Sequence, residues 1–346
     1  VSPLPHRPDA GADFAASGIA RNIAMTQRRT LLAASAGLAG LGLSARSAFA
    51  QQRFASIYMF IPAGPGGGWD GLGRAIEQAA RQAGLVGSFQ FENVGGAGGT
   101  VGLPRFLQQR RGRGEALMVG GSVMVGAALT NKTPVSLQNT VPVARMTEEA
   151  GVIIVPANSP YQTIGQLADA LKANPRAVSV AGGSAGGTDH IILGLMLQKL
   201  GRQPREASFV AFPGGGPAQA AILGGQVAAG ISGWSEFSEQ IKAGRVRALA
   251  TTGERRLDPA VPTLKESGLD VVATNWRGVF GAPGITAAQR QALVDLMTAI
   301  HATEGWRRIL ADRGWEDAFL TGAPFDQFLD RDRAEMEGVL KDLGLA

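Results

Sequence analysis

The 346-residue sequence contains no cysteine, which excludes disulfide bonds, thiolate zinc sites, iron–sulfur clusters and cysteine nucleophiles. Histidine is nearly as scarce, since only His6, His190 and His301 occur. His6 lies in a polar N-terminal stretch, so too few imidazoles remain for a multi-histidine metal site. We therefore expect neither a metal nor a cofactor.

Strong positive charge is also lacking once the N-terminus is set aside. The formal net charge is +5, and the five arginines and two aspartates before residue 51 supply +3 of it, which leaves +2 for the rest. No basic stripe interleaved with aromatic residues follows. Because nucleic-acid binding depends on such a surface, the composition does not favour it.

Residues 25–50 have the anatomy of a secretory signal. They combine a basic start, an apolar stretch of about 15 residues and a small-x-small ending at Ala48 and Ala50. The stretch is too short and too rich in glycine to span a bilayer permanently. We therefore expect export to the periplasm with cleavage after Ala50.

The export route is less sharply defined. Arg28 and Arg29, followed by Thr-Leu-Leu, resemble a twin-arginine signal, but Gln27 stands where the usual pattern has serine or threonine. The general secretory route therefore stays open. Residues 1–24 show no periodicity and precede a suitable start at Met25, so we interpret them as an upstream extension; a true leader is the alternative.

Intact mass or N-terminal sequencing of the exported protein is expected to show a mature chain that begins at Gln51. A mature chain that begins elsewhere would contradict this interpretation of the signal.

From residue 54 onward, short apolar runs alternate with helical patterns, which predicts an α/β fold with a mostly parallel sheet and helices on both faces. We expect a first lobe of residues 51–150 and 273–346, interrupted by a second lobe of residues 151–272, with a ligand site in the cleft between them. Strands are predicted at residues 54–61, 88–94, 115–120, 177–181, 207–211, 227–231, 247–251 and 271–280, with extended crossing segments at 141–146 and 151–155. Helices are predicted at residues 70–83, 103–110, 164–173, 189–200 and 217–223, and through most of 287–345.

The most informative segment is PAGPGGGWDG at residues 62–71, which lies between a predicted strand and a predicted helix. The first-turn amides of a helix have no partners within it, so such a loop can bind an anion. Asp70 is expected to cap this helix, because a carboxylate facing an anion would repel it.

Glycine-rich loops follow four further predicted strands. Any one glycine is most simply a turn former. Because open α/β sheets bind ligands at the carboxyl ends of their strands, five such loops at one edge favour a shared anion site. Hydroxyls there are offered by Ser122, Ser184 and Thr188, and a protonated His190 could donate as well. The four loops are NVGGAGGT (93–100), GGS (120–122), GGSAGGT (182–188) and FPGGGP (212–217).

An exported NAD(P)-dependent oxidoreductase is the alternative function. Gly66, Gly68 and Gly71 satisfy G-x-G-x-x-G, and Glu92 stands about where a ribose-binding acid would. A lone fingerprint in a glycine-rich chain is weak, however. No G-x-S-x-G motif occurs, and His190 is the only candidate base near the expected cleft, so we expect a binding protein and not an enzyme.

Over nearly all of its expected mature length the chain resembles the periplasmic solute receptors of tripartite tricarboxylate transporters, also called Bug receptors. The resemblance is specific because a whole series of motifs occurs in order. The series is PAGPGGGWD (62–70), ENVGGAGGTVG (92–102), GGSAGGTDH (182–190), GGGPAQAAILGGQV (214–227), IKAGRVRALATT (241–252), VPTLKESGLD (261–270) and NWRGVFGAPG (275–284).

The resemblance implies a type II periplasmic binding fold, a monomer that closes on a carboxylate and delivers it to a membrane permease. Segments around residues 69, 275–278 and 314–315 look most like the tricarboxylate branch, so a citrate-like acid is the first candidate and a dicarboxylate or aromatic acid the next. Phe212 and Pro213 replace a tyrosine and a lysine of many relatives, which weakens this transfer. The expected ligand-binding residues are Gly66, Gly67, Gly68, Trp69, Asp70, Ser122, Ser184, Gly187, Thr188, His190, Gly214 and Gly215.

Overall fold

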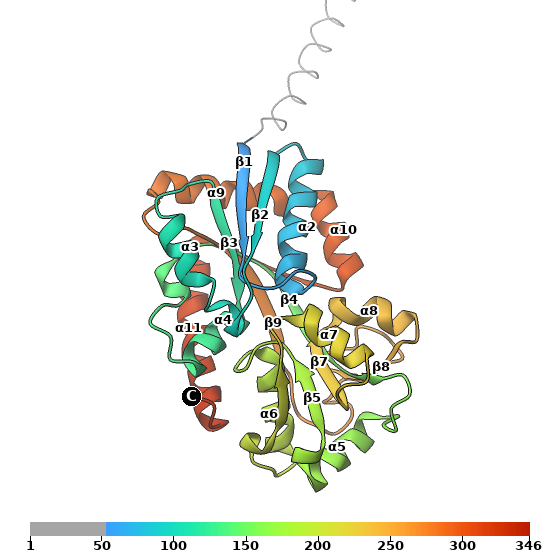
Figure 1. Ribbon diagram of the computed structural model, residues 1–346. Helices are drawn as coiled ribbons and strands as arrows, with labels where there is room; N and C mark the ends of the chain where they lie inside the picture. Colours follow the sequence, from blue (N-terminus) through green and yellow to red (C-terminus); the bar gives the residue numbers. More distant parts are fainter. Residues whose placement is uncertain (1–52) are drawn as a thin grey trace, which may run out of the picture. The chain divides into compact units, whose positions relative to one another are not determined.

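The computed structural model describes residues 53–346, so the expected extension and signal peptide lie outside the described residues. The strands form one mixed sheet in the order β2-β1-β3-β9-β4-β7-β5-β6, and β10 and β8 also pair with β4 (Figure 1). Helices pack around both ends of this sheet, which confirms the predicted two-lobe α/β class.

The first lobe contains a parallel set of strands, β2-β1-β3, followed by the antiparallel strand β9. Its strands are β1 (Phe54–Ile61), β2 (Val86–Asn93), β3 (Ala116–Gly121), β9 (Thr274–Gly281) and β10 (Glu316–Thr321). Its helices are α2 (Gly68–Gln82), α3 (Leu103–Gln109), α4 (Ser122–Thr130), α9 (Ala287–His301), α10 (Glu304–Arg313) and α11 (Gly322–Asp342), with short 3-10 turns η2 (Ala97–Gly99) and η3 (Leu137–Asn139).

The second lobe repeats this plan with β5 between β6 and β7, all three parallel. Its strands are β5 (Ser179–Gly182), β6 (Ser208–Ala211), β7 (Ala229–Gly233) and β8 (Val246–Thr251). Its helices are α5 (Ile164–Ala173), α6 (Thr188–Lys199), α7 (Gly215–Leu223) and α8 (Trp234–Lys242), with 3-10 turns η4 (Pro175–Ala177) and η5 (Pro204–Glu206).

One long strand, β4 (Val141–Pro156), joins the two lobes. Two separate extended segments were predicted there, but the structure has one continuous strand. Ala150 pairs with Thr274 of β9, and the next residue, Gly151, pairs with Gly233 of β7. This change of partner coincides with the expected lobe boundary. The division into separate domains stays a prediction, because β4 runs unbroken through it.

The sequence analysis did not predict three of the elements, namely α4, α8 and β10. Helix α4 is almost wholly apolar and lacks the polar face by which an amphipathic helix is recognised. Helix α8 is only 9 residues long, and β10 lies within a stretch predicted to be helical. Helix α2 also starts two residues earlier than predicted, at Gly68.

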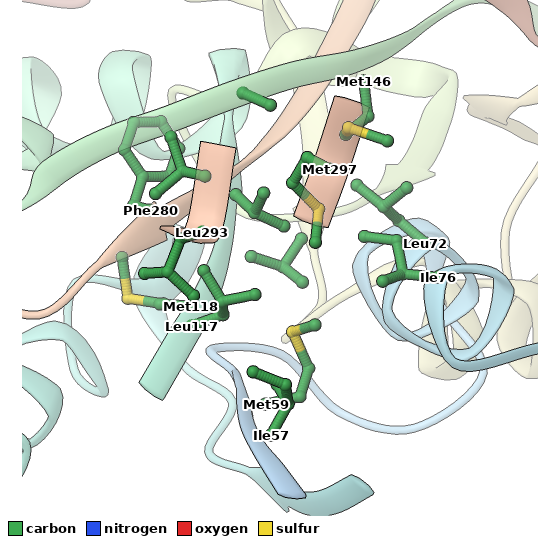
Figure 2. Packing of buried hydrophobic residues seen from close by; sticks show 14 of the residues in the cluster. Ile57, Met59, Leu72, Ile76, Leu117, Met118, Met146, Phe280, Leu293 and Met297 are labelled. Atoms are coloured by element: carbon green, nitrogen blue, oxygen red, sulfur yellow. The ribbon is translucent and has the colours of Figure 1, made fainter. Parts of the chain in front are cut away.

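The main hydrophobic core lies between the sheet and the helices of the first lobe (Figure 2). Ile57 and Met59 of β1 face Leu72 of α2 and Met297 of α9, and all four are fully buried. Trp306 and Trp315 belong to the same cluster, so the C-terminal part of the chain packs on the first lobe. This packing anchors the loops that follow β1, β2 and β3.

A second contact made by the C-terminal helix reaches the other lobe. Leu340 and Leu343, at the end of α11, pack with Ile191 of α6 in a small buried cluster. The start of α11 belongs to the first-lobe core through Phe325. Helix α11 therefore packs against both lobes.

We expect Phe280→Ala to lower the free energy of unfolding by about 3–5 kcal/mol, since it removes a fully buried ring and leaves a cavity. Phe280 lies on the central strand β9 and packs on Phe325 with ring centroids 5.8 Å apart. Urea denaturation measures the loss. Val101→Ala is the control, because Val101 is 58% exposed and should change little.

Candidate ligand-binding cleft

Loops from the two lobes meet directly across the cleft. The backbone amide of Gly98, after β2, donates a hydrogen bond to Ser184 Oγ, after β5, at 2.6 Å. On the other side, a Cβ placed on Gly67 would lie 3.4 Å from the amide nitrogen of Gly215. The loop after β1 therefore lies against the start of α7, so the cleft is closed by contacts on both sides.

A small cavity of about 60 Å³ lies between these loops. Four of the five glycine-rich loops line it, and the loop after β3 contributes only through the neighbouring Val123 of α4. The predicted convergence at one edge of the sheet is therefore present in the structure. The lining residues are Pro62, Ala63, Gly67, Gly68, Trp69, Gly96, Gly98, Gly99, Val123, Gly183, Ser184, Asp189, Pro213, Gly214, Gly215, Ser232, Glu236, Asn275 and Arg277.

Two helices begin at the cavity with glycine caps. Gly67 caps α2 and Gly214 caps α7, and neither helix start receives a side-chain hydrogen bond. Gly214 has φ of 133°, a conformation that other residues rarely adopt. First-turn amides without a side-chain partner remain available to an anion, and the helix dipole adds positive potential there.

The predicted role of Asp70 as the helix cap is wrong, because α2 already begins at Gly68. Asp70 instead accepts hydrogen bonds from the Gly66 amide at 3.2 Å and from Asn93 Nδ2 at 3.1 Å, and it does not line the cavity. Asp189 of α6 accepts similarly from the Gly183 amide at 2.7 Å. Asp70 near the start of α2 and Asp189 near the start of α6 thus each hold the glycine loop that precedes their helix.

The remaining expected residues do not line the cavity. Ser122 Oγ donates to Asn275 Oδ1 at 2.7 Å and lies 3.4 Å from the hydroxyl of Thr188, at the starts of α4 and α6. These contacts join the two lobes and orient Asn275 toward the lining. Of the twelve expected residues, the six outside the lining are Gly66, Asp70, Ser122, Gly187, Thr188 and His190.

His190 is unsuited to the anion-donor role expected for it. Its Nδ1 accepts a hydrogen bond from the Gly186 amide at 3.2 Å, and its ring stacks on Phe209 with centroids 4.4 Å apart. Burial lowers the pKa of His190, which favours the neutral ring. Its contacts therefore support the loop and the start of α6.

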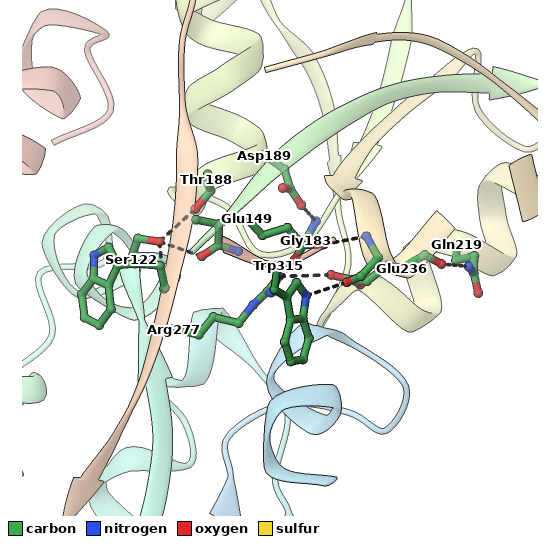
Figure 3. Close-up of polar contacts among 12 residues, drawn as sticks. Ser122, Glu149, Gly183, Thr188, Asp189, Gln219, Glu236, Arg277 and Trp315 are labelled. Carbon is green, nitrogen blue, oxygen red and sulfur yellow. Dashed lines mark hydrogen bonds and ion pairs between the residues drawn. The ribbon is translucent and has the colours of Figure 1, made fainter. Parts of the chain in front are cut away.

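A buried charge cluster beside the cavity is the main feature that sequence reasoning missed (Figure 3). Arg277 of β9 is 1% exposed and forms an ion pair with Glu149 of β4, which is 0% exposed. Its Nη2 also lies 3.7 Å from Glu236 Oε1, while its Nε has no hydrogen-bond partner. The anion site expected from the sequence included backbone amides, hydroxyls and His190, but no arginine.

Arg277 also explains why glycine is required at the start of α2. A Cβ on Gly68 would lie 2.4 Å from Arg277 Nη2, so any larger residue would displace the guanidinium. The only sequence signal for Arg277 was its place in the NWRG motif, since nothing in one sequence shows that an arginine on a strand is buried.

Two acids beside Arg277 have a pKa above their usual range. Burial raises the pKa of Glu236 to about 8 and that of Asp189 to about 6. The Arg277 guanidinium opposes both shifts, and the charge of Glu149 reinforces them. At neutral pH Glu236 is therefore mostly a neutral carboxylic acid.

Comparison with known proteins settles the family. Residues 74–345 match the model of the tripartite tricarboxylate transporter family receptor. The chain belongs to this family. Members of this family are substrate-binding receptors rather than enzymes, and they are periplasmic.

The curated relatives are distant in sequence, and each match covers only part of both proteins. The receptor is 29% identical over 198 residues to the UPF0065 protein in the gbd 5′ region of Cupriavidus necator, a match that covers 56% of the receptor. It is 30% identical over 164 residues to BugT of Bordetella pertussis, covering 46% of the receptor. The matches span only 59% and 49% of these relatives' own lengths.

Solved structures share the fold of the receptor. The periplasmic binding protein BugD superposes with a TM-score of 0.75 at 22% identity, over 84% of the receptor and 98% of BugD. MatC from Rhodopseudomonas palustris, determined with bound malate, superposes with a TM-score of 0.71 at 23% identity, over 82% of the receptor and 98% of MatC. A second R. palustris protein, determined with adipate, has a TM-score of 0.75 at 21% identity, over 84% and 97% of the two chains.

The residues proposed for an oxidoreductase do not form a nucleotide site in the receptor. Glu92 accepts a hydrogen bond from Tyr58 and forms an ion pair with Arg105, so it is not free to bind a ribose. Gly71 lies against Arg313 and Trp315, away from the cavity lining. The alternative function is therefore set aside. Within residues 53–346, no helix combines the length and apolar character that crossing a membrane requires.

We expect Arg277→Met to lower the free energy of unfolding by about 3–5 kcal/mol, because it leaves Glu149 buried without its partner. Arg255→Met is the matched control. Arg255 is 78% exposed, and its ion pair with Glu316 should contribute almost nothing. Chemical denaturation of both variants measures the difference, and equal losses would show that the buried pair has no special role.

Proposed function

We propose that this protein is a periplasmic receptor that binds a small carboxylate and delivers it to the permease of a tripartite tricarboxylate transporter. The observation that carries the proposal is the pair of glycine-capped helix starts, α2 and α7, at one cavity between the lobes. Both present backbone amides, and the ligand charge is stabilised without a dedicated surface cation.

The strength of such contacts suffices for a receptor. A charge-assisted hydrogen bond contributes about 1.5–3 kcal/mol, and a helix N-terminus adds about 0.3–1 kcal/mol. Four to six contacts, less the cost of ordering the ligand, reach about −8 kcal/mol, which corresponds to micromolar affinity. Ser184 and Asn275 supply polar side chains in the same lining.

The proposed ligand is a tricarboxylate such as citrate, with a dicarboxylate or an aromatic acid next. MatC and the second R. palustris protein, which share the fold, were determined with malate and adipate. Delivery to the permease, export with cleavage after Ala50 and a monomeric state complete the proposal.

The test is a thermal-shift and calorimetric screen of the mature protein with citrate, malate, adipate, benzoate, NADH and NADPH. A ligand bound only by the native state raises the melting temperature, and we expect this for an acid and not for the nucleotides. Nucleotide binding without any response to the acids would overturn the proposal.

Gly67→Val is expected to weaken acid binding at least tenfold while leaving the fold intact. Gly67 has φ of −87°, which valine adopts readily, but the added methyl groups would project toward the start of α7. Isothermal titration with the acid found in the screen measures the loss. Gly338→Val on α11 is the matched control, since a Cβ there meets nothing within 4 Å.

Unchanged affinity in Gly67→Val would place the site elsewhere. Gly187 is unsuitable for the same test, although it was expected to contact the ligand. A Cβ there would lie 2.9 Å from the Ser184 carbonyl oxygen, so the backbone would have to shift.

A further inference from the structure

The carboxyl group of Glu236 lies where the two helix starts meet. Glu236 is in the first turn of α8 and lines the cavity, with a side chain only 11% exposed. A Cβ on Gly215 would lie 1.6 Å from its Oε2, and one on Gly67 would lie 4.0 Å from the same atom. Glu236 thus approaches both helix starts that are proposed to bind the ligand.

Oε2 of Glu236 has no hydrogen-bond partner in the protein, although it is buried. The same is true of Nε of Arg277, whose side chain is 1% exposed. Leaving a buried polar atom unpaired is costly, and the cost disappears when a ligand supplies the missing partner. Both atoms belong to residues of the cavity lining, so a polar ligand bound there can supply the missing partners.

Charged groups from several elements surround Glu236. Arg277 of β9 approaches its Oε1, and Glu149 of β4 holds the other side of the same guanidinium while accepting from the Ser235 amide at 2.6 Å. Asp189 of α6 and Ser232 of β7 also line the cavity, and the Ser232 hydroxyl acts to lower the pKa of Glu236. Arg313 of α10 lies farther off, over the Trp315 ring at 4.9 Å.

Three acids thus share one fully buried guanidinium. They cannot all be ionised in so small a volume without strong mutual repulsion. An anionic ligand in the same cavity adds another negative charge and disfavours ionised Glu236 further. A neutral Glu236 has a proton to donate, and a ligand carboxylate oxygen is a strong acceptor for it.

We propose that Glu236 contacts the ligand as a protonated acid, donating a hydrogen bond from its carboxyl group to a carboxylate of the bound acid. The receptor then recognises the ionised ligand by a neutral acid as well as by backbone amides. Ligand affinity depends on that proton and is lost in alkaline solution. This inference rests on the proposed carboxylate-binding function and specifies its chemistry.

The direction of the pH effect follows from the placement of Glu236. Burial raises the pKa of Glu236 to about 8, so its carboxyl group is mostly protonated at pH 7. Above pH 8 it ionises, loses the donor and repels the ligand, and affinity then falls up to tenfold per pH unit. Asp189, with its pKa raised by burial to about 6, completes its titration below this range.

The test measures binding of citrate, malate and adipate to the mature protein between pH 6.5 and 9.5 by calorimetry. The wild type is expected to lose affinity above pH 8. Glu236→Gln keeps a donor without a titrating proton, so it should bind within a few fold of the wild type at pH 7 and show no loss at pH 9.5. Glu236→Ala should bind at least tenfold more weakly at pH 7.

Glu239→Gln is the matched control on the same helix. Glu239 has a 79% exposed side chain paired with Lys242, so this variant should follow the wild-type pH profile. A Glu236→Gln profile that still falls above pH 8, or wild-type affinity in Glu236→Ala, would overturn the inference while leaving the receptor function intact. Failure of every acid to bind the wild type would overturn both.

A ligand-free measurement gives a second check. The pKa of Glu236 lies above the ordinary value of 4.5, so the folded protein holds a proton that the unfolded chain releases. Stability is therefore lost as pH rises from 4.5 through about 8. The melting temperature of Glu236→Gln should rise relative to the wild type over this range. Parallel curves would show that Glu236 holds no proton and would overturn the inference.

Discussion

The buried ion pair between Arg277 and Glu149 is the interaction on which the rest of the cleft depends. It joins β9 of the first lobe to β4, the long strand that runs through both lobes, just beside the cavity. Desolvating two charges is costly, and the pair is tolerated only with close geometry and further partners. Gly68 makes room for the guanidinium, so the ion pair and the start of α2 constrain one another.

The site gathers positive and negative groups in nearly balanced numbers. Backbone amides at the starts of α2 and α7 and the guanidinium of Arg277 attract an anion, whereas Glu149, Asp189 and Glu236 oppose it. Burial shifts this balance because it keeps Glu236 protonated near neutral pH. A cavity with such compensation can hold an acid without a permanent excess of positive charge. The same compensation makes affinity sensitive to a single proton.

Rigid packing supplies the precision that this balance requires. The loops after β1 and β2 follow strands of the main core, where Ile57 and Met59 are fully buried. Asp70 and Asp189 each fix a glycine loop through a backbone amide. Ser184 and Ser122 then link the lobes by hydroxyl contacts with Gly98 and Thr188. The geometry of the cavity is therefore held both by lining residues and by residues outside the lining, such as Asp70, Ser122 and Thr188.

The sequence by itself determined the local features. Apolar runs alternating with helical patterns predicted the α/β class. They also placed β1, α5 and most parallel strands within a few residues of their observed bounds, because such patterns depend only on residues close in the sequence. Glycine loops at strand ends pointed to the cleft, since parallel strands bring their carboxyl ends to one edge. The ordered motifs indicated the family. The absence of cysteine and the scarcity of histidine excluded thiol chemistry and a multi-histidine metal site.

Only the tertiary structure decided which side chains share the cavity. Arg277 and Glu149 are 128 positions apart, and their contact depends on the antiparallel register of β4 and β9, which no local pattern encodes. How the lobes meet also decides that Glu236 lines the cavity, whereas Thr188 and His190 do not. Charge, burial and protonation of this site are therefore properties of long-range packing, whereas the loops that frame it are properties of the sequence.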